Sequence, residues 1–151
     1  MSLDIELTGI EDIQKALLSI GNKAKEVEET SLNKGAEVIL NTAKNNLSTV
    51  AKKRTGKLEE NLGISKVKRR KGQKYILVGL EPDDTSEIFY GKFLEWGAMP
   101  HTIRIRKGKS AGRTIHLPGI SPRPFLAPAY ESKKEEVKKI IANEFRKALG
   151  L

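Results

Sequence analysis

The residues of this chain that could do chemistry are few and lie far apart. His101 and His116 are its only histidines, and each has an arginine nearby in sequence but no carboxylate. A histidine that acts as a general base or binds a metal usually needs a partner that orients its ring. We therefore expect both histidines to have surface or packing roles.

A group of carboxylates, Asp83, Asp84 and Glu87, has the ligand type that suits a hard divalent cation. Its spacing is not that of an EF-hand loop, and a solvated turn that caps the next helix explains the same residues. No glycine-rich segment has the spacing of a dinucleotide-binding or P-loop motif. The sequence predicts no metal site, no cofactor and no enzymatic activity.

Two other segments, Tyr90–Ala98 and Ser121–Ala129, carry the most informative patterns of the chain. The first gathers aromatic residues around Glu95 and closes on Gly97, and the second is stiffened by prolines and places Phe125 just before a helical pattern. Proline fixes φ and removes a backbone donor, and a rigid extended segment loses less entropy when it docks. Both segments therefore have the features of assembly surfaces. The interface candidates are Tyr90, Phe93, Glu95, Trp96, Pro124, Phe125 and Leu126.

Three of these candidates have an alternative role. Phe125 could instead tuck into the chain's own core below the last helix. Glu95 could pair with an arginine or a lysine, within or across subunits, or be an ordinary exposed glutamate. Trp96 could belong to the core, and its replacement by alanine would then damage folding instead of assembly.

The bulk composition indicates a folded chain that turns much of its surface to water or to a partner. Its 151 residues are enough for a real core, and we assign residues 1–151 to a single domain. Only 38% of the residues are hydrophobic, while 31% are charged, above the usual quarter. The absence of cysteine excludes a disulfide framework and agrees with a reducing cytoplasm. No apolar run approaches the roughly 20 residues of a membrane span, and the acidic N-terminus does not resemble a signal peptide.

The formal net charge of +9 is unevenly distributed. Residues 1–30 hold seven acids against three bases, residues 44–74 hold eleven bases against two acids, and residues 96–130 hold six bases and no acid. Such polarity favours separate faces that meet separate neighbours, although a solvated basic surface would look the same. The cations expected at hairpin tips are candidates for contact with DNA or with neighbouring proteins. They are Lys68, Arg69, Arg70, Lys71, Arg106, Lys107, Lys109 and Arg113.

Apolar periodicity predicts an α+β chain. A capping box at Thr8–Glu11 opens a short helix that Gly21 ends, and a long helix follows over about 23–47. Gly35 in that helix either permits a close approach of another backbone or is merely tolerated. The later elements are a hairpin over 62–80 with its tip at 68–74, a short helix ending at Gly97, a hairpin over 102–106 and 113–117, and a helix over about 128–149. We expect a single domain with an antiparallel sheet built from two hairpins, packed against a long N-terminal-half helix and a C-terminal helix.

Three motifs, in this order, resemble those of the HK97 gp10-like family of tailed-phage proteins. They are T-G-x-L at Thr55–Leu58 after the long helix, Tyr90 followed by Glu95-Trp96-Gly97, and P-F-L-x-P-A at Pro124–Ala129 before the last helix. The resemblance spans about residues 5–150. Ala98 stands where many members have threonine, so side-chain contacts at that turn are not carried over.

The resemblance implies a non-enzymatic structural protein of a phage or prophage that joins head and tail or completes the tail. It further implies an oligomeric ring, with six subunits as the expected number, around the DNA passage. The implied partners are other copies of the chain, phage connector and tail proteins, and DNA through non-specific contacts. The implied location is the virion neck, and the host bacterial cytoplasm during assembly.

The alternative function is a small basic nucleic-acid-binding module. Aromatic residues interleaved with the basic strands would favour it, because they would serve as stacking platforms for bases. Only Tyr75 meets that condition, since the other aromatic residues cluster in the short helix and the proline-rich bridge. An enzyme such as a nuclease would need a carboxylate–histidine or carboxylate–metal site, which this sequence does not assemble.

Overall fold

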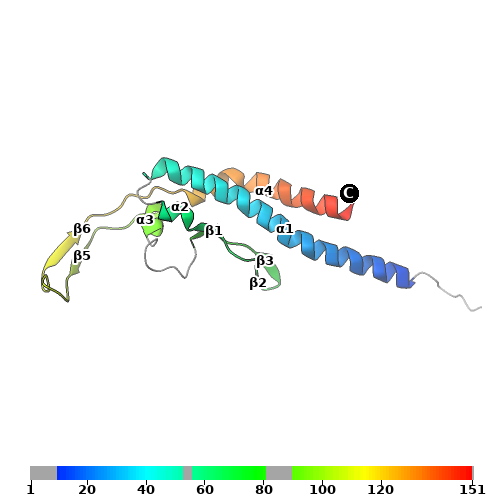
Figure 1. Cartoon of the computed structure of the whole chain (residues 1–151), viewed down its shortest axis with the longest axis horizontal. Coiled ribbons are helices and arrows are strands. Elements are labelled where there is room, and N and C mark those ends of the chain that lie inside the picture. Colours follow the sequence, from blue (N-terminus) through cyan, green and yellow to red (C-terminus); the bar gives the residue numbers. More distant parts are fainter. Residues whose placement is uncertain (1–9, 53–55, 81–89, 151) are drawn as a thin grey trace, which may run out of the picture.

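The molecule is built on one long helix, against which the C-terminal helix packs (Figure 1). The computed structural model describes residues 10–52, 56–80 and 90–150, with the side chains of the first helix described from Leu18 onward. The α+β class is confirmed. The elements in chain order are α1 (Ile10–Val50), α2 (Lys57–Glu60), β1 (Leu62–Ile64), β2 (Lys68–Arg70), β3 (Gln73–Tyr75), β4 (Val78–Leu80), α3 (Tyr90–Trp96), β5 (His101–Arg104), β6 (Thr114–Leu117) and α4 (Leu126–Leu149).

The long helix α1 corrects the break that we expected at Gly21. It is a single helix of 41 residues, and Gly21 keeps a helical backbone inside it. One glycine costs a helix only about 1 kcal/mol, and the leucine, alanine, lysine and glutamate residues around it are good helix formers. Thr8, the expected cap, lies outside the described residues. Although α1 is long, neither it nor another described helix is apolar enough to cross a membrane.

The core lies where α1, α2, β1 and the start of α4 meet. Its largest fully buried side chain is that of Phe125, which is 1% exposed. Small side chains of α1 are buried as well, among them Ser31, Ala36 and Ala43. The apolar residues of this core are Ala43, Leu47, Leu58, Leu62, Phe125 and Ala129.

The strands form three separate two-stranded antiparallel sheets. β1 pairs with β4 and β2 with β3, so the hairpin expected over 62–80 is confirmed, with an interruption at Ser65, whose hydroxyl accepts the N–H of Leu77 at 3.0 Å. Lys71 and Gly72 form its turn with φ of 50° and 81°, as a tight hairpin turn requires. β5 pairs with β6 in the second expected hairpin, which projects beyond the helices (Figure 1). The two hairpins stay separate and do not join into one sheet, because the chain leaves the core after α3 and the second hairpin begins beyond it.

Lys74 on β3 fastens the first hairpin to α1. Its Nζ lies 3.2 Å from Glu28 Oε2 and 3.0 Å from Glu29 Oε1, and it donates to the carbonyl oxygen of Lys25 at 3.3 Å. The hydrogen bond to Glu29 raises the pKa of Lys74 above its ordinary value, against the opposing effect of desolvation. One cation of the expected tip at 68–74 is therefore engaged within the chain itself.

The two long helices approach closely at Gly35. A Cβ atom at this position would lie 2.7 Å from Cγ1 of Val137, so only glycine fits beneath that side chain. The expected close approach is thus found, but the approaching group is a valine side chain and not a backbone. Nearby, Lys34 Nζ forms an ion pair with Glu144 Oε2 at 2.7 Å, which joins α1 to α4.

The Gly35 contact predicts that Gly35→Ala lowers the free energy of unfolding. Alanine gains about 1 kcal/mol of helix propensity, but overpacking against the stiff Val137 side chain costs about 1–3 kcal/mol. Urea denaturation measures the balance. Gly21→Ala is the matched control in the same helix, because nothing lies within 4 Å of the added methyl group and its effect is stabilising. Adding Val137→Ala to Gly35→Ala relieves the clash, and a Gly35→Ala chain as stable as Gly21→Ala would contradict this packing.

The Lys34–Glu144 pair predicts a stability difference that depends on pH. The hydrogen bond from Lys34 lowers the pKa of Glu144 below its ordinary value. A lowered carboxyl pKa stabilises the fold above the unfolded value and loses that effect as the pH falls through the folded value. Glu144→Gln is therefore less stable than the native chain at pH 7, and the difference shrinks as the pH falls below about 4. Thermal melts of both chains from about pH 7 to about pH 2 test this, and a difference that does not change with pH would contradict it.

Candidate functional site

Glu95 joins the two segments that the sequence singled out. It lies in the last turn of α3 and is 7% exposed. Its Oε2 accepts the backbone N–H of Phe125 at 2.8 Å and that of Leu126 at 3.0 Å, and its Oε1 accepts the N–H of Ala127 at 2.8 Å. One carboxylate therefore binds three successive backbone amides about thirty residues further along the chain.

The start of α4 explains why a carboxylate is needed there. The first N–H groups of a helix have no partner within the helix, and the residue at the N-cap position, Phe125, offers no side-chain oxygen to accept them. Pro128 has no N–H, so Glu95 takes both donors that the first three helical residues provide. A negative charge at a helix N-terminus is also stabilised by the helix dipole. Glu95 thus caps α4 from a different helix.

Backbone contacts complete this junction between α3 and α4. The N–H of Arg123 donates to the carbonyl oxygen of Leu94 at 2.7 Å, and Ala98 and Ile120 exchange two hydrogen bonds of 2.9 and 2.8 Å. Gly97 has φ of 74°, and a Cβ atom on it would lie 2.7 Å from the carbonyl oxygen of Ile120. The glycine that ends α3 is therefore required both by its backbone conformation and by the close approach of the returning chain.

The junction decides between the roles that the sequence left open for two residues. Among the described residues, the groups that hydrogen-bond to the Glu95 carboxylate are backbone amides and not lysine or arginine side chains. The side chain of Glu95 is buried and not exposed. Phe125 is buried in the core of the described chain, as in the alternative role given for it above. Leu126 is half-buried beside it and packs against the same core. Asn46 of α1 donates to the carbonyl oxygen of Phe125 at 3.1 Å and fixes the backbone there.

Other candidates from the same two segments face outward. Trp96 follows Glu95 directly but is 74% exposed, so its ring is not part of the core of the described chain. Tyr90 and Phe93 are exposed to a lesser extent on the same helix, and Pro124 is exposed beside the buried Phe125. The predicted interface candidates therefore fall into two groups, buried residues that form the junction and exposed residues on its surface.

Two exposed apolar residues at the junction were not predicted. Met99, which follows Ala98, is 87% exposed. Ile120, which pairs with Ala98 in an isolated β-bridge, is exposed as well. Both lie in irregular segments, where periodicity gives no indication of which side chains are buried. The usable signal was an apolar residue between a glycine and a proline in a stretch with no helix or strand pattern, Met99 between Gly97 and Pro100 and Ile120 between Gly119 and Pro122.

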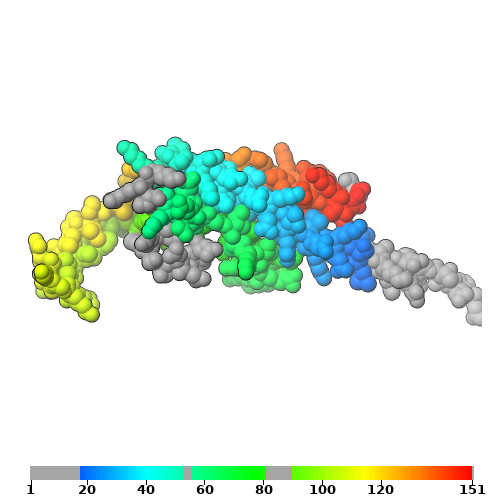
Figure 2. Space-filling model, in the orientation of Figure 1, coloured from blue at the N-terminus to red at the C-terminus, as the bar shows by residue number. Residues whose placement is uncertain are grey.

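The predicted cations lie on two separate ribbons. Lys68, Arg69, Arg70 and Lys71 are exposed on and beside β2, whereas the second set is exposed around the turn between β5 and β6. Figure 2 shows the second ribbon, in yellow, standing away from the body of the molecule. The structure thus does not bring the two basic groups together into one patch. The second set comprises Arg106, Lys107, Lys109 and Arg113.

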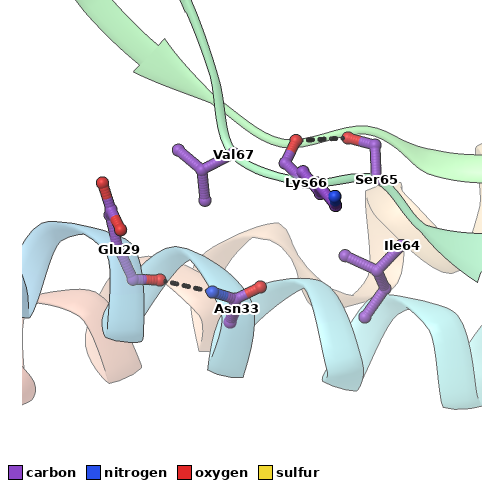
Figure 3. Close-up of a pocket in the computed structure, with 6 residues that line it drawn as sticks. All are labelled: Glu29, Asn33, Ile64, Ser65, Lys66 and Val67. Carbon is purple, nitrogen blue, oxygen red and sulfur yellow. Dashed lines mark hydrogen bonds between the residues drawn. The ribbon is translucent and has the colours of Figure 1, made fainter.

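A shallow pocket of about 500 Å³ lies between α1 and the segment that follows β1 (Figure 3). The amide of Asn33 donates to the carbonyl oxygen of Glu29 at 2.9 Å, and the hydroxyl of Ser65 donates to the carbonyl oxygen of Lys66 at 2.9 Å. These polar groups satisfy the chain's own backbone, and no nucleophile is paired with a base among them. The lining residues are Glu29, Asn33, Ile64, Ser65, Lys66 and Val67.

The histidines lie on the second hairpin. His116 Nδ1 is 3.1 Å from the hydroxyl of Thr102, and His101 Nδ1 is 3.2 Å from the carbonyl oxygen of Met99. Within residues 10–52, 56–80 and 90–150, no group of three or more metal-ligating side chains comes together. The carboxylates at Asp83, Asp84 and Glu87 lie outside those residues.

The cap on α4 predicts that Glu95 is among the most sensitive polar positions. Glu95→Ala leaves the amides at the start of α4 without their acceptor, and an unsatisfied buried donor costs about 1–3 kcal/mol. Glu95→Gln keeps one acceptor oxygen but turns an amide NH₂ toward a donor, so it also lowers the free energy of unfolding. Glu37→Gln, at an exposed glutamate of α1, is the control and changes stability by less than about 0.5 kcal/mol. Urea denaturation compares them, and a Glu95→Gln chain as stable as Glu37→Gln would argue against the cap.

A comparison with protein families gives a match within the first two thirds of the chain. The model of the HK97-gp10-like family, described as a candidate bacteriophage tail component, matches residues 11–97, which is more than half of the chain. The match covers α1 through α3 and includes Glu95, Trp96 and Gly97, and it ends before the proline-rich segment that Glu95 binds. No curated protein and no solved structure matches the chain. From the matched span and the α+β fold, the chain belongs to the HK97-gp10-like family of bacteriophage tail components.

Proposed function

We propose that this protein joins head and tail, or completes the tail, as a non-enzymatic structural component of a phage or prophage. In this role it forms an oligomeric ring at the virion neck, around the path of the DNA, with six subunits as the expected number. The ring assembles in the host bacterial cytoplasm from copies of the chain and meets the connector on one side and tail proteins on the other. Its family supplies the general structural role.

The observation that carries this proposal is the exposed apolar surface at the α3–α4 junction. Trp96, Met99 and Ile120 are exposed on a backbone that the Glu95 cap and the Ala98–Ile120 bridge hold in place. Groups of exposed apolar residues mark interaction sites, and tryptophan is among the residue types enriched at the hot spots of interfaces. A surface held rigid before binding loses little entropy when a partner covers it.

The exposed cations fit a passage for DNA. Their lysine and arginine side chains can screen phosphate without reading sequence, as a channel for a whole genome requires. The same cations are what favours the alternative, a nucleic-acid-binding module. Tyr75, the one aromatic residue among these basic strands, is only half exposed, which weakens the alternative's stacking platform.

We also infer that residues 1–151 form one domain. The core that α1 builds with α2 and β1 is completed by Phe125 and Ala129, which lie outside the matched residues 11–97. A chain cut after α3 would expose this core and leave Glu95 without the amides that it binds.

The solution mass of the purified chain tests the proposed function. Light scattering over a series of protein and salt concentrations, with and without duplex DNA, is expected to show a ring-sized species whose formation does not require DNA. Trp96→Ala is expected to keep the native melting curve and to shift this equilibrium toward monomers. A persistent monomer that binds DNA with a steep salt dependence would overturn the ring in favour of the alternative. If Trp96→Ala assembles normally, the exposed surface at Trp96 is not part of the contact between subunits.

A further inference from the structure

The hairpin β5–β6, together with the turn that joins its strands, forms an arm over residues 101–117. Ile103 and Ile115 are directly opposite each other in the register, so their side chains share one face of the ribbon. They are 42% and 41% exposed, and the arm stands off from both long helices (Figures 1 and 2). An isolated two-stranded ribbon is at best marginally stable in water. The arm therefore has the form of an element that a partner completes.

The opposite end of the molecule carries a second uncovered element. Lys34 pairs with Glu144, five residues before the end of α4, whereas α1 continues for 24 residues on the N-terminal side of Lys34. At 1.5 Å per residue, the N-terminal part of α1 extends roughly 30 Å beyond the C-terminal end of α4. Leu18 and Ile20 in this overhang are exposed. Figure 1 shows the overhang, in blue, and the arm at the two far ends of the long axis.

The charges of these two ends are opposite. The arm, residues 101–117, holds five bases and no acid, whereas the overhang, residues 10–29, holds five acids and three bases. Glu26 is exposed on the overhang, and the side chains of Glu28 and Glu29 keep 38% and 57% of their surface exposed even though both bind Lys74. Opposite charges steer two surfaces together and fix their register. Two like arms would instead repel each other.

We propose that the arm of one copy docks on the α1 overhang of the next copy, head to tail. The apolar face at Ile103 and Ile115 covers Leu18, the more exposed of the two apolar side chains, because Leu18 and Ile20 lie about 200° apart around the helix axis and one ribbon face cannot cover both. The arm's arginines lie against the glutamates of the overhang. Such a contact joins two different patches, so it repeats from copy to copy and closes when the rotation permits. This inference rests on the proposed ring and names the surfaces that would form it.

Two double variants, each with one defective end, test the contact. The arm variant carries Ile103→Thr and Ile115→Thr, which keep strand propensity, and the overhang variant carries Leu18→Gln and Ile20→Gln, which keep helix propensity. All four positions are outside the core, so far-UV circular dichroism and thermal melts should match the native chain. Leu77→Thr, at an exposed apolar residue away from both ends, is the control.

Light scattering is expected to show that each double variant alone self-associates about tenfold or more weakly than the native chain, while Leu77→Thr assembles normally. An equimolar mixture of the two variants should form a 1:1 pair and nothing larger, because it contains one intact arm and one intact overhang. Variants that assemble like the native chain, or a mixture that stays monomeric, would overturn the contact and leave the ring standing. If the arm variant fails to assemble and the overhang variant assembles normally, the arm pairs with another arm and the proposed contact is wrong. If the arm variant assembles normally but no longer binds DNA, the arm contacts DNA and the proposed contact is again wrong. A monomeric native chain would overturn the ring itself and the contact with it.

Discussion

The structure depends on one carboxylate that caps a helix from outside it. Glu95 on α3 accepts the first amides of α4, and this places Phe125 in the core that α1 builds with α2 and β1. Without it, α4 would begin with a phenylalanine at its N-cap and a proline in its first turn, neither of which can satisfy the free amides. The register of the two helices α1 and α4 would then depend on their remaining contacts, among them the approach of Val137 to Gly35, the Lys34–Glu144 pair and the hydrogen bond from Asn46 to the carbonyl oxygen of Phe125.

The same cap determines where the rest of the chain can go. Between α3 and α4 the backbone leaves the core at Gly97 and returns at Arg123, and the Ala98–Ile120 bridge holds the two passing segments together. The arm grows out of that bridge, so its base is fixed even though its faces are open. With strands of three or four residues the sheets bury little by themselves, and the stability of the fold therefore comes mainly from the contact between helices.

The sequence was sufficient to predict the elements that depend on local pattern. Both hairpins, the short helix before Gly97 and the C-terminal helix follow from alternation, periodicity and turn residues. The break at Gly21 was wrong because a single glycine is a weak signal within a run of good helix formers. The partner of Glu95 could not be predicted, because no local rule pairs a carboxylate with amides thirty residues away. The exposure of Met99 and Ile120 was not predicted for a related reason, since irregular segments have no period from which burial can be inferred.

Neighbouring residues in the two motifs have opposite roles, and this follows from helix geometry. Glu95 and Trp96 are consecutive in α3, so their side chains are separated by about 100° around the helix axis, and one turns inward when the other turns outward. Pro124 and Phe125 also divide into an exposed and a buried residue, although both precede α4, which begins at Leu126. The buried member of each pair fixes the backbone from which the exposed member projects. Conservative changes at Glu95 or Phe125 would therefore disturb the surface at Trp96 without touching it, and in the proposed ring this couples the integrity of the fold to the shape of that surface.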